Sequence, residues 1–435
     1  MKKKLLAFGV AGLLVLLVAS IGLAAIEFSV GGDFRTLSYY VANPDLNKDV
    51  GVERTYTEQR LILNPVLKLS DAIQLKMRIR ALDYIWGYNG VPGLTWPGMI
   101  DATGAATNQG EGGSNNFQWD RAWVQVGLGK LGSIQIGRQQ TDLFHNFSIA
   151  EDDTYPRYHY ITPVFGLPND NNIMFGMLYD KRAEGAIDVS GDDAFAWCPW
   201  VFFWNPKITV GYVFFVWDVA NVGPAGESSN WIMHDAMINA KIGPVDIKSE
   251  IDYLMGRGIG AWQKLKHTLE FFVDASVPLK TPPIERASVV VGLFSGTTDA
   301  DPAEYITGSI GSNEDWVDEW KIDLILWDQI YNTIRNAWII RPKIDFVVPN
   351  SKFGGFLSAC MSFADQEAQY NPGPLPLTAG TEKGIGTEID LGVNYTLGPR
   401  QTIELVAGIL MPGKYFDEAN RDTTIGAALK THIRF

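Results

Sequence analysis

The residues best suited to act on a ligand are five basic side chains, which recur on alternate positions of three consecutive predicted strands. They are Arg60, Lys76, Arg78, Arg80 and Arg121. Neighbouring strands of a sheet lie about 4.8 Å apart, so side chains on one face of adjacent strands stand close together. We therefore expect these residues to form one wall of positive charge.

The third long connection predicted along the chain carries negative charge, on Asp142, Glu151, Asp152 and Asp153. Opposed charges across a constriction orient polar solutes and filter them by charge. If this connection folds towards the basic residues, the two groups together predict a selectivity region. The alternative is that the basic residues pair with nearby carboxylates and water, and only stabilise a wet interior.

Other residue types do not suggest a reaction. The sequence has no haem-attachment, CxxC or zinc-ligand spacing, and no motif that pairs a nucleophile with a base. Its five histidines form no convincing metal site. Cys198 and Cys360 each lie in an apolar stretch, where we interpret them as small apolar side chains, with a disulfide between them as the alternative. We predict no catalytic residue, no metal and no cofactor, and hence a protein that is not an enzyme.

The elements that position these residues are strands with a period of two. In residues 73–81 the odd positions are apolar, whereas positions 74, 76, 78 and 80 hold Gln, Lys or Arg. After the leader, no apolar run approaches the roughly 20 residues of a transmembrane helix. The hydrophobic fraction is nevertheless 46%, and the chain has 14 Trp and 16 Tyr. Alternating strands, with Trp and Tyr gathered at two interfaces, are typical of membrane β-barrels.

The connections predict how the sheet closes. Backbone polar groups in lipid must all be paired, which requires a closed sheet. Short connections, such as 70–72, 129–132 and 205–206, alternate with long ones, such as 41–53, 88–115 and 144–170. Both ends of the mature chain fall on the short-turn side, so the strand number is even. We predict an all-β fold: one antiparallel transmembrane barrel over residues 26–435, with eighteen strands, or sixteen as the fallback.

Periplasmic turns are expected to be short and extracellular loops long. Two stretches are ambiguous in this prediction. Residues 173–204 contain either one strand or two, and residues 316–330 are either strand or a short helix within a loop.

Residues 1–25 have the pattern of a secretory signal peptide. Three lysines at positions 2–4 precede an apolar stretch from Leu5 to Leu23, and the small residues Ala24 and Ala25 follow. The alternative is a permanent transmembrane anchor, because the apolar run is just long enough to span a bilayer. We expect cleavage, export and insertion into the bacterial outer membrane. The net charge of −13 makes nucleic acid an unsuitable partner.

Two segments carry a resemblance to known families. Residues 127–139, GLGKLGSIQIGRQ, look like the strand-turn-strand of Gram-negative porins that leads into their constriction loop. Residues 386–391, GTEIDL, followed by 411–416, MPGKYF, resemble the end of the alginate-export family of outer-membrane barrels. The terminal strand ending in Phe435 is similar to the signal read by the barrel-assembly machinery. The resemblance implies a passive channel, eighteen strands in the alginate-export case, and a third loop folded inward.

Arg138 is a special case. Strict alternation from Ile134 and Ile136 aims its side chain at lipid, which costs about 2–4 kcal/mol at the midplane. Either a bulge turns Arg138 inward, or it lies near the interface and its side chain snorkels. The porin likeness favours the inward position, and we therefore count Arg138 among the expected pore-lining residues.

The resulting expectation is an outer-membrane channel for passive diffusion of small hydrophilic or charged solutes. The alternatives are a substrate-specific exporter or importer of acidic sugars or organic acids, and a barrel that encloses a partner protein. Expected partners are outer-membrane lipid and lipopolysaccharide, the solutes themselves, and the barrel-assembly machinery during insertion. Many porins are homotrimers, which is one expectation here, whereas barrels of the alginate-export type are expected to be monomers.

Overall fold

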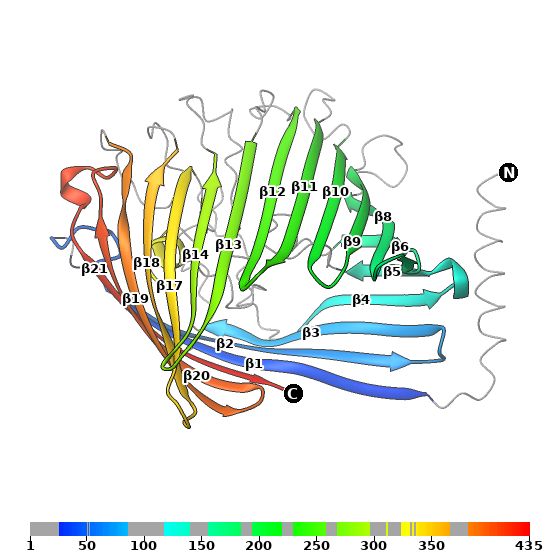
Figure 1. The fold of residues 1–435 in the computed structure, drawn as a ribbon, viewed down its shortest axis with the longest axis horizontal. Helices are drawn as coiled ribbons and strands as arrows, with labels where there is room; N and C mark the ends of the chain where they lie inside the picture. The colour runs from blue at the N-terminus through cyan, green and yellow to red at the C-terminus, as the bar shows by residue number, and fades with distance from the viewer. Residues whose placement is uncertain are drawn as a thin grey trace.

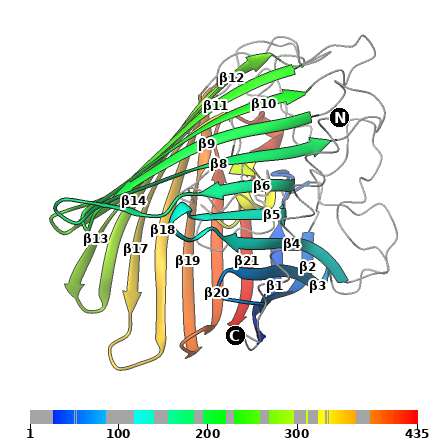
Figure 2. The same ribbon diagram turned by 90° about the vertical axis from the view of Figure 1, so that its right-hand side faces the viewer.

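One antiparallel sheet closes on itself in the computed structural model of the chain (Figures 1 and 2). The structure describes residues 26–49, 51, 53–85, 117–139, 155–183, 194–219, 229–257, 268–295, 310–311, 323–330, 333–334, 336–365 and 382–435. The first strand pairs with the last, in register from Asp33 opposite Arg434 to Ala42 opposite Ile425. This pairing removes both sheet edges, as a barrel in lipid requires.

The strands follow one another round the barrel in chain order. They are β1 (Glu27–Ala42), β2 (Glu53–Lys68), β3 (Ile73–Ile85), β4 (Phe117–Gly127), β5 (Ser133–Gln139), β6 (Tyr155–Ile161), β7 (Phe165–Leu167), β8 (Asn171–Ala183), β9 (Ala194–Trp204), β10 (Ile208–Val219), β11 (Ser229–Ile242), β12 (Val245–Arg257), β13 (Thr268–Thr281), β14 (Ile284–Phe294), β17 (Ala337–Val347), β18 (Phe353–Ala364), β19 (Gly384–Gly398), β20 (Gln401–Pro412) and β21 (Thr424–Arg434). A separate short pair is formed by β15 (Ile310–Gly311) and β16 (Thr333–Ile334).

The predicted number of eighteen strands is confirmed. The sheet has 19 strand segments, but β6 and β7 both pair with β8 and together fill one position of the barrel. The ambiguous stretch 173–204 resolves into two strands, β8 and β9. The predicted long connection 144–170 was too long, because β6 and β7 lie within it. The outward positions of β6 hold Pro156, Tyr158 and Tyr160 instead of aliphatic residues, and the strand has only seven residues, so its alternation is weaker than in strands such as β3.

Side chains within the short turns define their geometry. At the turn between β9 and β10, Asn205 Oδ1 accepts the backbone N–H groups of Lys207 and Ile208 at 2.9 and 3.0 Å. Asparagine closes such turns because its side chain imitates a backbone acceptor. Gly243, between β11 and β12, has a φ of +60°, a value that suits glycine. These local signals explain why the positions of the short turns could be predicted.

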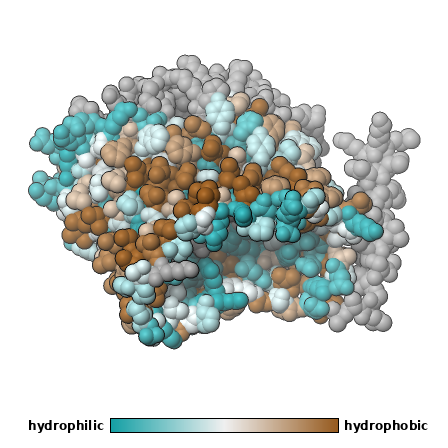
Figure 3. Space-filling model, in the orientation of Figure 1, coloured by the Kyte–Doolittle hydropathy of each residue, from teal (hydrophilic) through white to brown (hydrophobic). Residues whose placement is uncertain are grey.

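The two faces of the wall differ in polarity. Large apolar side chains point outward and stay exposed, among them Ile251, Leu391, Leu405 and Ile425. In Figure 3 the outward-facing residues form a band of hydrophobic surface, and a recess with hydrophilic residues opens below it. Among the described residues, no helix is long and apolar enough to cross a membrane. The alternation therefore presents an apolar outside and a largely polar inside.

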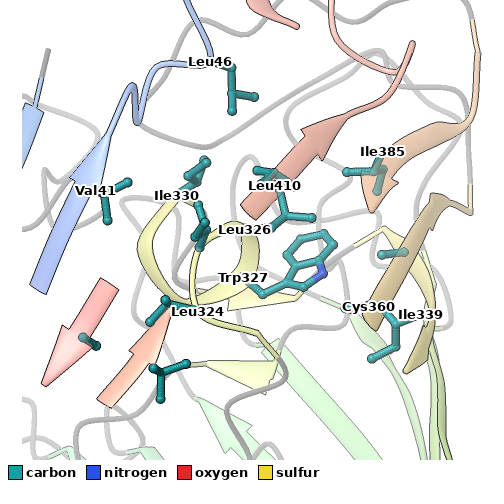
Figure 4. Close-up of a cluster of buried hydrophobic side chains, with 14 of the residues drawn as sticks. Val41, Leu46, Leu324, Leu326, Trp327, Ile330, Ile339, Cys360, Ile385 and Leu410 are labelled. Carbon is teal, nitrogen blue, oxygen red and sulfur yellow. The ribbon is translucent and has the colours of Figure 1, made fainter. Parts of the chain in front are cut away.

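The largest buried apolar cluster lies on the inner side of the wall. Residues 323–330 pack against inner-face side chains of β1 and β17–β21, including Val41, Ile339 and Leu410 (Figure 4). Their last part forms a π-helical turn, Leu326–Ile330, which agrees with the second of the two alternatives, a short helix within a loop. Cys360 belongs to this cluster and Cys198 to a second one on β8–β11, and both cysteines are free. The interpretation of two small buried side chains is confirmed, and the disulfide alternative is not.

Candidate functional site

The first part of the candidate site is a basic wall on β1–β4, formed by Arg35, Arg60, Lys76, Arg78, Arg80 and Arg121. Its members face one another across neighbouring strands. Arg35 is directly opposite Arg60, and Arg78 is directly opposite Arg121. The predicted basic residues of three strands therefore do share one inner face.

The basic wall has a carboxylate at its centre. Asp120 Oδ2 lies 3.4 Å from the Nε of Arg78, 3.5 Å from that of Arg80 and 3.6 Å from that of Arg121. All four side chains are buried or nearly so, with at most 12% exposed. Charge pairs in such surroundings are screened far less than exposed pairs. Part of the alternative, that nearby carboxylates stabilise the basic residues, thus holds for these three arginines.

Asp120 reaches the inner face through a β-bulge. The register between β3 and β4 slips after Arg78 opposite Arg121, so that Ile79 is opposite Trp119 and Asp120 is the extra residue. A bulge allows two successive side chains to point to one face. Strict alternation from the inward-facing Arg121 would place Asp120 outward. The overlooked signal was an Asp and an Arg at consecutive positions, because one of them would otherwise face lipid.

Arg138 does not join the basic wall, which corrects the expectation drawn from the porin likeness. Its side chain is exposed on the outer face of β5, between Ala122 of β4 and Pro156 of β6. The pairing of β4 with β5 runs without a register shift from Ser133 to Arg138. Because no bulge intervenes, Arg138 keeps the outward parity of Ile134 and Ile136. It lies one residue before the end of β5, where a long side chain can reach the interface.

The predicted acidic partners of the basic wall are Asp142, Glu151, Asp152 and Asp153. These four residues lie outside the described residues. Their role therefore stays a prediction, as does the inward folding of the connection that carries them.

An acidic wall occupies the inner face of β11–β13, formed by Asp235, Glu250, Asp252 and Glu270. Asp235 is directly opposite Asp252, and Asp252 is directly opposite Glu270. Each of the four residues is at most 6% exposed. In the sequence all four occupy polar positions of segments with a period of two, but nothing local shows that they form one contiguous group.

The basic and acidic walls lie on opposite sides of the barrel. Of the eighteen positions, β1–β4 fill the first four and β11–β13 fill the tenth to twelfth, with β6 and β7 sharing one position. Figure 1 shows β1–β4 along one side and β11–β13 along the other. Opposite charge on facing walls creates a field across the lumen, directed from the basic wall to the acidic wall.

Elsewhere the inner face carries locally balanced pairs. Arg157 on β6 donates two hydrogen bonds to Asp180 on β8, at 2.6 and 2.7 Å, and both side chains are fully buried. Lys430 lies 3.6 Å from Glu404, on β21 and β20. The sequence missed the Arg157 pair because it placed residue 157 in a loop. Not every described inner-face carboxylate has such a partner, because Glu388 lies close enough to Asp323 and Asp390 for their charges to interact.

The second part of the candidate site is the inner segment, residues 323–330 of the connection between β14 and β17. Glu388 of β19 holds it: Oε1 accepts the N–H groups of Leu324 and Ile325 at 2.8 and 2.7 Å, and Oε2 accepts that of Leu326 at 2.8 Å. The segment therefore occupies lumen space on one side of the barrel.

Two further contacts fix the inner segment. Asp323 Oδ1 accepts the N–H of Trp327 at 2.8 Å, and the Trp327 Nε1–H donates to Ser362 Oγ at 3.0 Å. Figure 4 shows Trp327 beside the strands that carry Cys360 and Ile339. The sequence left a strand and a short helix as alternatives here, and nothing local indicates which wall a loop packs against.

Solved structures with the same architecture are outer-membrane proteins. The chain is similar to OccK9 (OpdG) of Pseudomonas aeruginosa, with a TM-score of 0.51, 13% identity, and coverage of 94% of this chain and 99% of that one. It is also similar to OccK5 (OpdH) of the same organism, with a TM-score of 0.49, 10% identity, and coverage of 94% and 98%. The anion-selective porin of Comamonas acidovorans matches with a TM-score of 0.45, 13% identity, and coverage of 94% and 100%.

These likenesses concern the fold, which is a porin-type barrel. No family model matches the chain, and no curated protein matches it. The resemblance to the alginate-export family has no counterpart in these comparisons.

Proposed function

We propose that this protein is an outer-membrane channel through which small hydrophilic or charged solutes diffuse passively. The observation that carries the proposal is the opposition of the basic wall to the acidic wall in a barrel with an apolar outer face. A barrel of eighteen strands is wide enough to leave an aqueous interior, as 16- to 18-stranded porins do. Charged side chains that line a narrow pore are the usual basis of ion selectivity in such channels.

The two walls act on solutes that pass close to them. The Debye length is about 8 Å at physiological ionic strength, so the charge of either wall is screened within a few ångströms of open water. A solute confined to a narrow lumen stays within that range of at least one wall. An anion is then drawn to the Arg78, Arg80 and Arg121 side, a cation to the Asp252 side, and a dipolar solute aligns between them.

The inner segment supports a constriction. It is clamped to β19 by Glu388 and packs on the inner faces of six strands, so it narrows the lumen from the side of β17–β21 and β1. The position and charge of the two walls would then determine charge selectivity, while the inner segment would limit the size of the solutes that pass.

Planar-bilayer recordings test this function. The purified barrel is expected to conduct ions, and Arg78→Gln with Arg80→Gln is expected to shift the reversal potential in a KCl gradient towards cation selectivity. Neutralising the opposite wall with Asp252→Asn and Glu270→Gln should shift it the other way. A barrel that inserts into the bilayer but conducts no current would contradict the channel proposal. An unchanged reversal potential in both variants would contradict the role of the two walls in selectivity.

A solute-specific channel for organic acids or acidic sugars is the second candidate, favoured by the three arginines gathered on the inner face of β3 and β4. Liposome swelling with neutral, anionic and cationic solutes of equal size separates the two. A general channel admits all three classes at rates ordered by size, whereas a specific one admits chiefly the anions and saturates. Export by a cleaved signal peptide, residues 1–25, is proposed alongside, and those residues lie outside the described part of the chain.

A further inference from the structure

The carboxylates of the acidic wall lie unusually close to one another. The carboxylate oxygens of Asp235, Glu250 and Asp252 lie within 4.8 Å of one another, and all three residues are buried. Glu270 is directly opposite Asp252 on the next strand and is 4% exposed. Asp252 is also the charged residue that acts electrostatically on Glu270. Four carboxylates thus meet in one buried place.

Two of the four carboxylates, Asp252 and Glu270, each have one oxygen without a hydrogen bond to the described residues. Within the described part of the chain, Oδ1 of Asp252 and Oε2 of Glu270 are buried and have no hydrogen-bond partner. Asp252 contacts Asp235 through a side-chain hydrogen bond, which joins one acid to another. Both unpartnered oxygens belong to residues more than nine-tenths buried, and both lie at the junction of β12 and β13.

Several other acidic residues of the same inner face have basic neighbours. Asp180 is held by Arg157, and Glu404 lies beside Lys430. Asp274, four residues after Glu270 on β13, lies within electrostatic reach of Lys248, Arg286, Lys343 and Arg341. At these three positions basic side chains compensate the charge of the carboxylate.

Buried carboxylates that share a site cannot all ionise without a compensating positive charge. A buried charge in proteins is paired or coordinates a metal. Calcium is bound by oxygen ligands at about 2.3–2.6 Å, so two ligands on opposite sides of one ion lie up to about 5 Å apart. The ligand oxygens of the three carboxylates lie within 4.8 Å of one another, which is inside this limit. Magnesium is bound at about 2.0–2.1 Å in a strict octahedral shell and usually keeps several waters, so a site made of protein carboxylates suits calcium better.

We propose that Asp235, Glu250 and Asp252 bind a Ca²⁺ ion on the inner wall of the barrel, with Glu270 supplying a further carboxylate at its edge. The bound ion offsets the negative charge of the acidic wall and ties β11, β12 and β13 together on the inner face. Selectivity of the lumen then depends on the free Ca²⁺ concentration. The site itself does not rest on the channel function, because binding can be measured without current.

Equilibrium dialysis with ⁴⁵Ca²⁺ on the refolded full chain in detergent tests the site. The pair Asp252→Asn and Glu270→Gln is expected to bind one Ca²⁺ fewer per barrel than the unaltered chain. Glu404→Gln is the matched control, because Glu404 is an inner-wall carboxylate with a lysine partner, and its stoichiometry should not change. Acidic residues elsewhere contribute equally to all three proteins and cancel in the comparison. Equal stoichiometry in all three proteins would overturn the proposal.

A second measurement needs no variant and covers the case in which the double variant fails to fold. Crystals of the unaltered chain are soaked in TbCl₃, because Tb³⁺ is a heavier ion that occupies calcium sites. We expect an anomalous peak bounded by Asp235, Glu250 and Asp252. Absence of that peak, with anomalous peaks present elsewhere in the same crystal, overturns the site. Neither experiment measures conduction, so the absence of Ca²⁺ binding would not contradict the channel proposal. Conversely, a barrel that conducts no current but still binds Ca²⁺ would support the site and contradict only the channel proposal.

Discussion

Glu388 and Leu326 are 62 residues apart in the sequence, yet the N–H of Leu326 donates a 2.8 Å hydrogen bond to the Glu388 carboxylate. Together with the bonds from Leu324 and Ile325, this contact attaches the inner segment to β19. The Glu388 side chain thus attaches part of the connection between β14 and β17 to the barrel wall.

Replacement of that side chain is expected to release the inner segment. Hydrogen bonds to a charged acceptor contribute about 1.5–3 kcal/mol each, so Glu388→Ala removes several kcal/mol of docking free energy. The single-channel conductance should rise, because less of the lumen is filled. Glu404→Ala, which alters a partly exposed carboxylate on β20, should leave conductance near its original value. An unchanged conductance in folded Glu388→Ala would contradict the role of the inner segment as a constriction.

The contact between Gly426 and the inner segment allows a steric test of the same constriction. A Cβ atom at Gly426 would lie 2.8 Å from Ile325 Cγ1, a distance that forces one of them to move. Gly426→Val should therefore displace the inner segment and raise conductance, with little further change when combined with Glu388→Ala. Gly166 on β7 has no atom within 4 Å of its added Cβ, so Gly166→Val is the control. Additive effects of the two inner-segment changes would argue against a shared cause.

The carboxylate at the centre of the basic wall should influence ion selectivity. Asp120→Asn removes a negative charge from among Arg78, Arg80 and Arg121. The reversal potential in a KCl gradient is expected to move towards anion selectivity, opposite to the effect of Arg78→Gln with Arg80→Gln. Loss of the bulged carboxylate also lowers stability, so folding is verified by heat-modifiable migration on gels. A shift towards cations in the folded variant would refute this assignment.

The buried pair of Arg157 and Asp180 should show strong coupling in stability. Removing one partner leaves the other charge buried and uncompensated, which costs about 3–5 kcal/mol. Arg157→Met is therefore expected to lower the free energy of unfolding in urea by that amount. Arg157→Met combined with Asp180→Leu should recover most of the loss, since an apolar pair of similar volume is often neutral. A double variant as unstable as the sum of the single variants would rule out the coupling.

The connection between β20 and β21 provides a pH-dependent contact. Asp422 accepts the backbone N–H of Lys48 at 2.9 Å and lies 3.4 Å from its ammonium group, and these contacts hold the pKa of Asp422 below its ordinary value of 3.8. A lowered pKa means that the stabilisation is complete above the unfolded value and disappears as pH falls through the folded value. Hydrogen exchange at the Lys48 amide should therefore accelerate in Asp422→Asn at pH 7 but match the unaltered chain at pH 2. A difference of the same size at both pH values would contradict the ionic origin.

The strands and their faces could be predicted because alternation is a local property. Whether Ile251 faces lipid and Asp252 the lumen follows from parity along one strand, and the structure confirms it. Prediction failed where parity is interrupted or hidden. The bulge at Asp120 reverses the expected face of one residue, and β6 is short, with Pro156, Tyr158 and Tyr160 in place of aliphatic residues on its outer face. Arg138 shows the opposite error, because a bulge was expected where the ladder is regular.

By itself, the sequence determined a closed, antiparallel barrel with an even number of strands, eighteen or sixteen, and with Arg78, Arg80 and Arg121 on its inner face. It could do so because side-chain parity and the length of each connection are written along the chain. Only the tertiary structure decided that the acidic wall stands across the lumen from the basic wall, that Asp120 turns inward, and that Glu388 holds residues 323–330. These relations depend on strand order around a closed circle, on register between neighbours and on where a loop packs. All three are set by contacts between residues far apart in the chain.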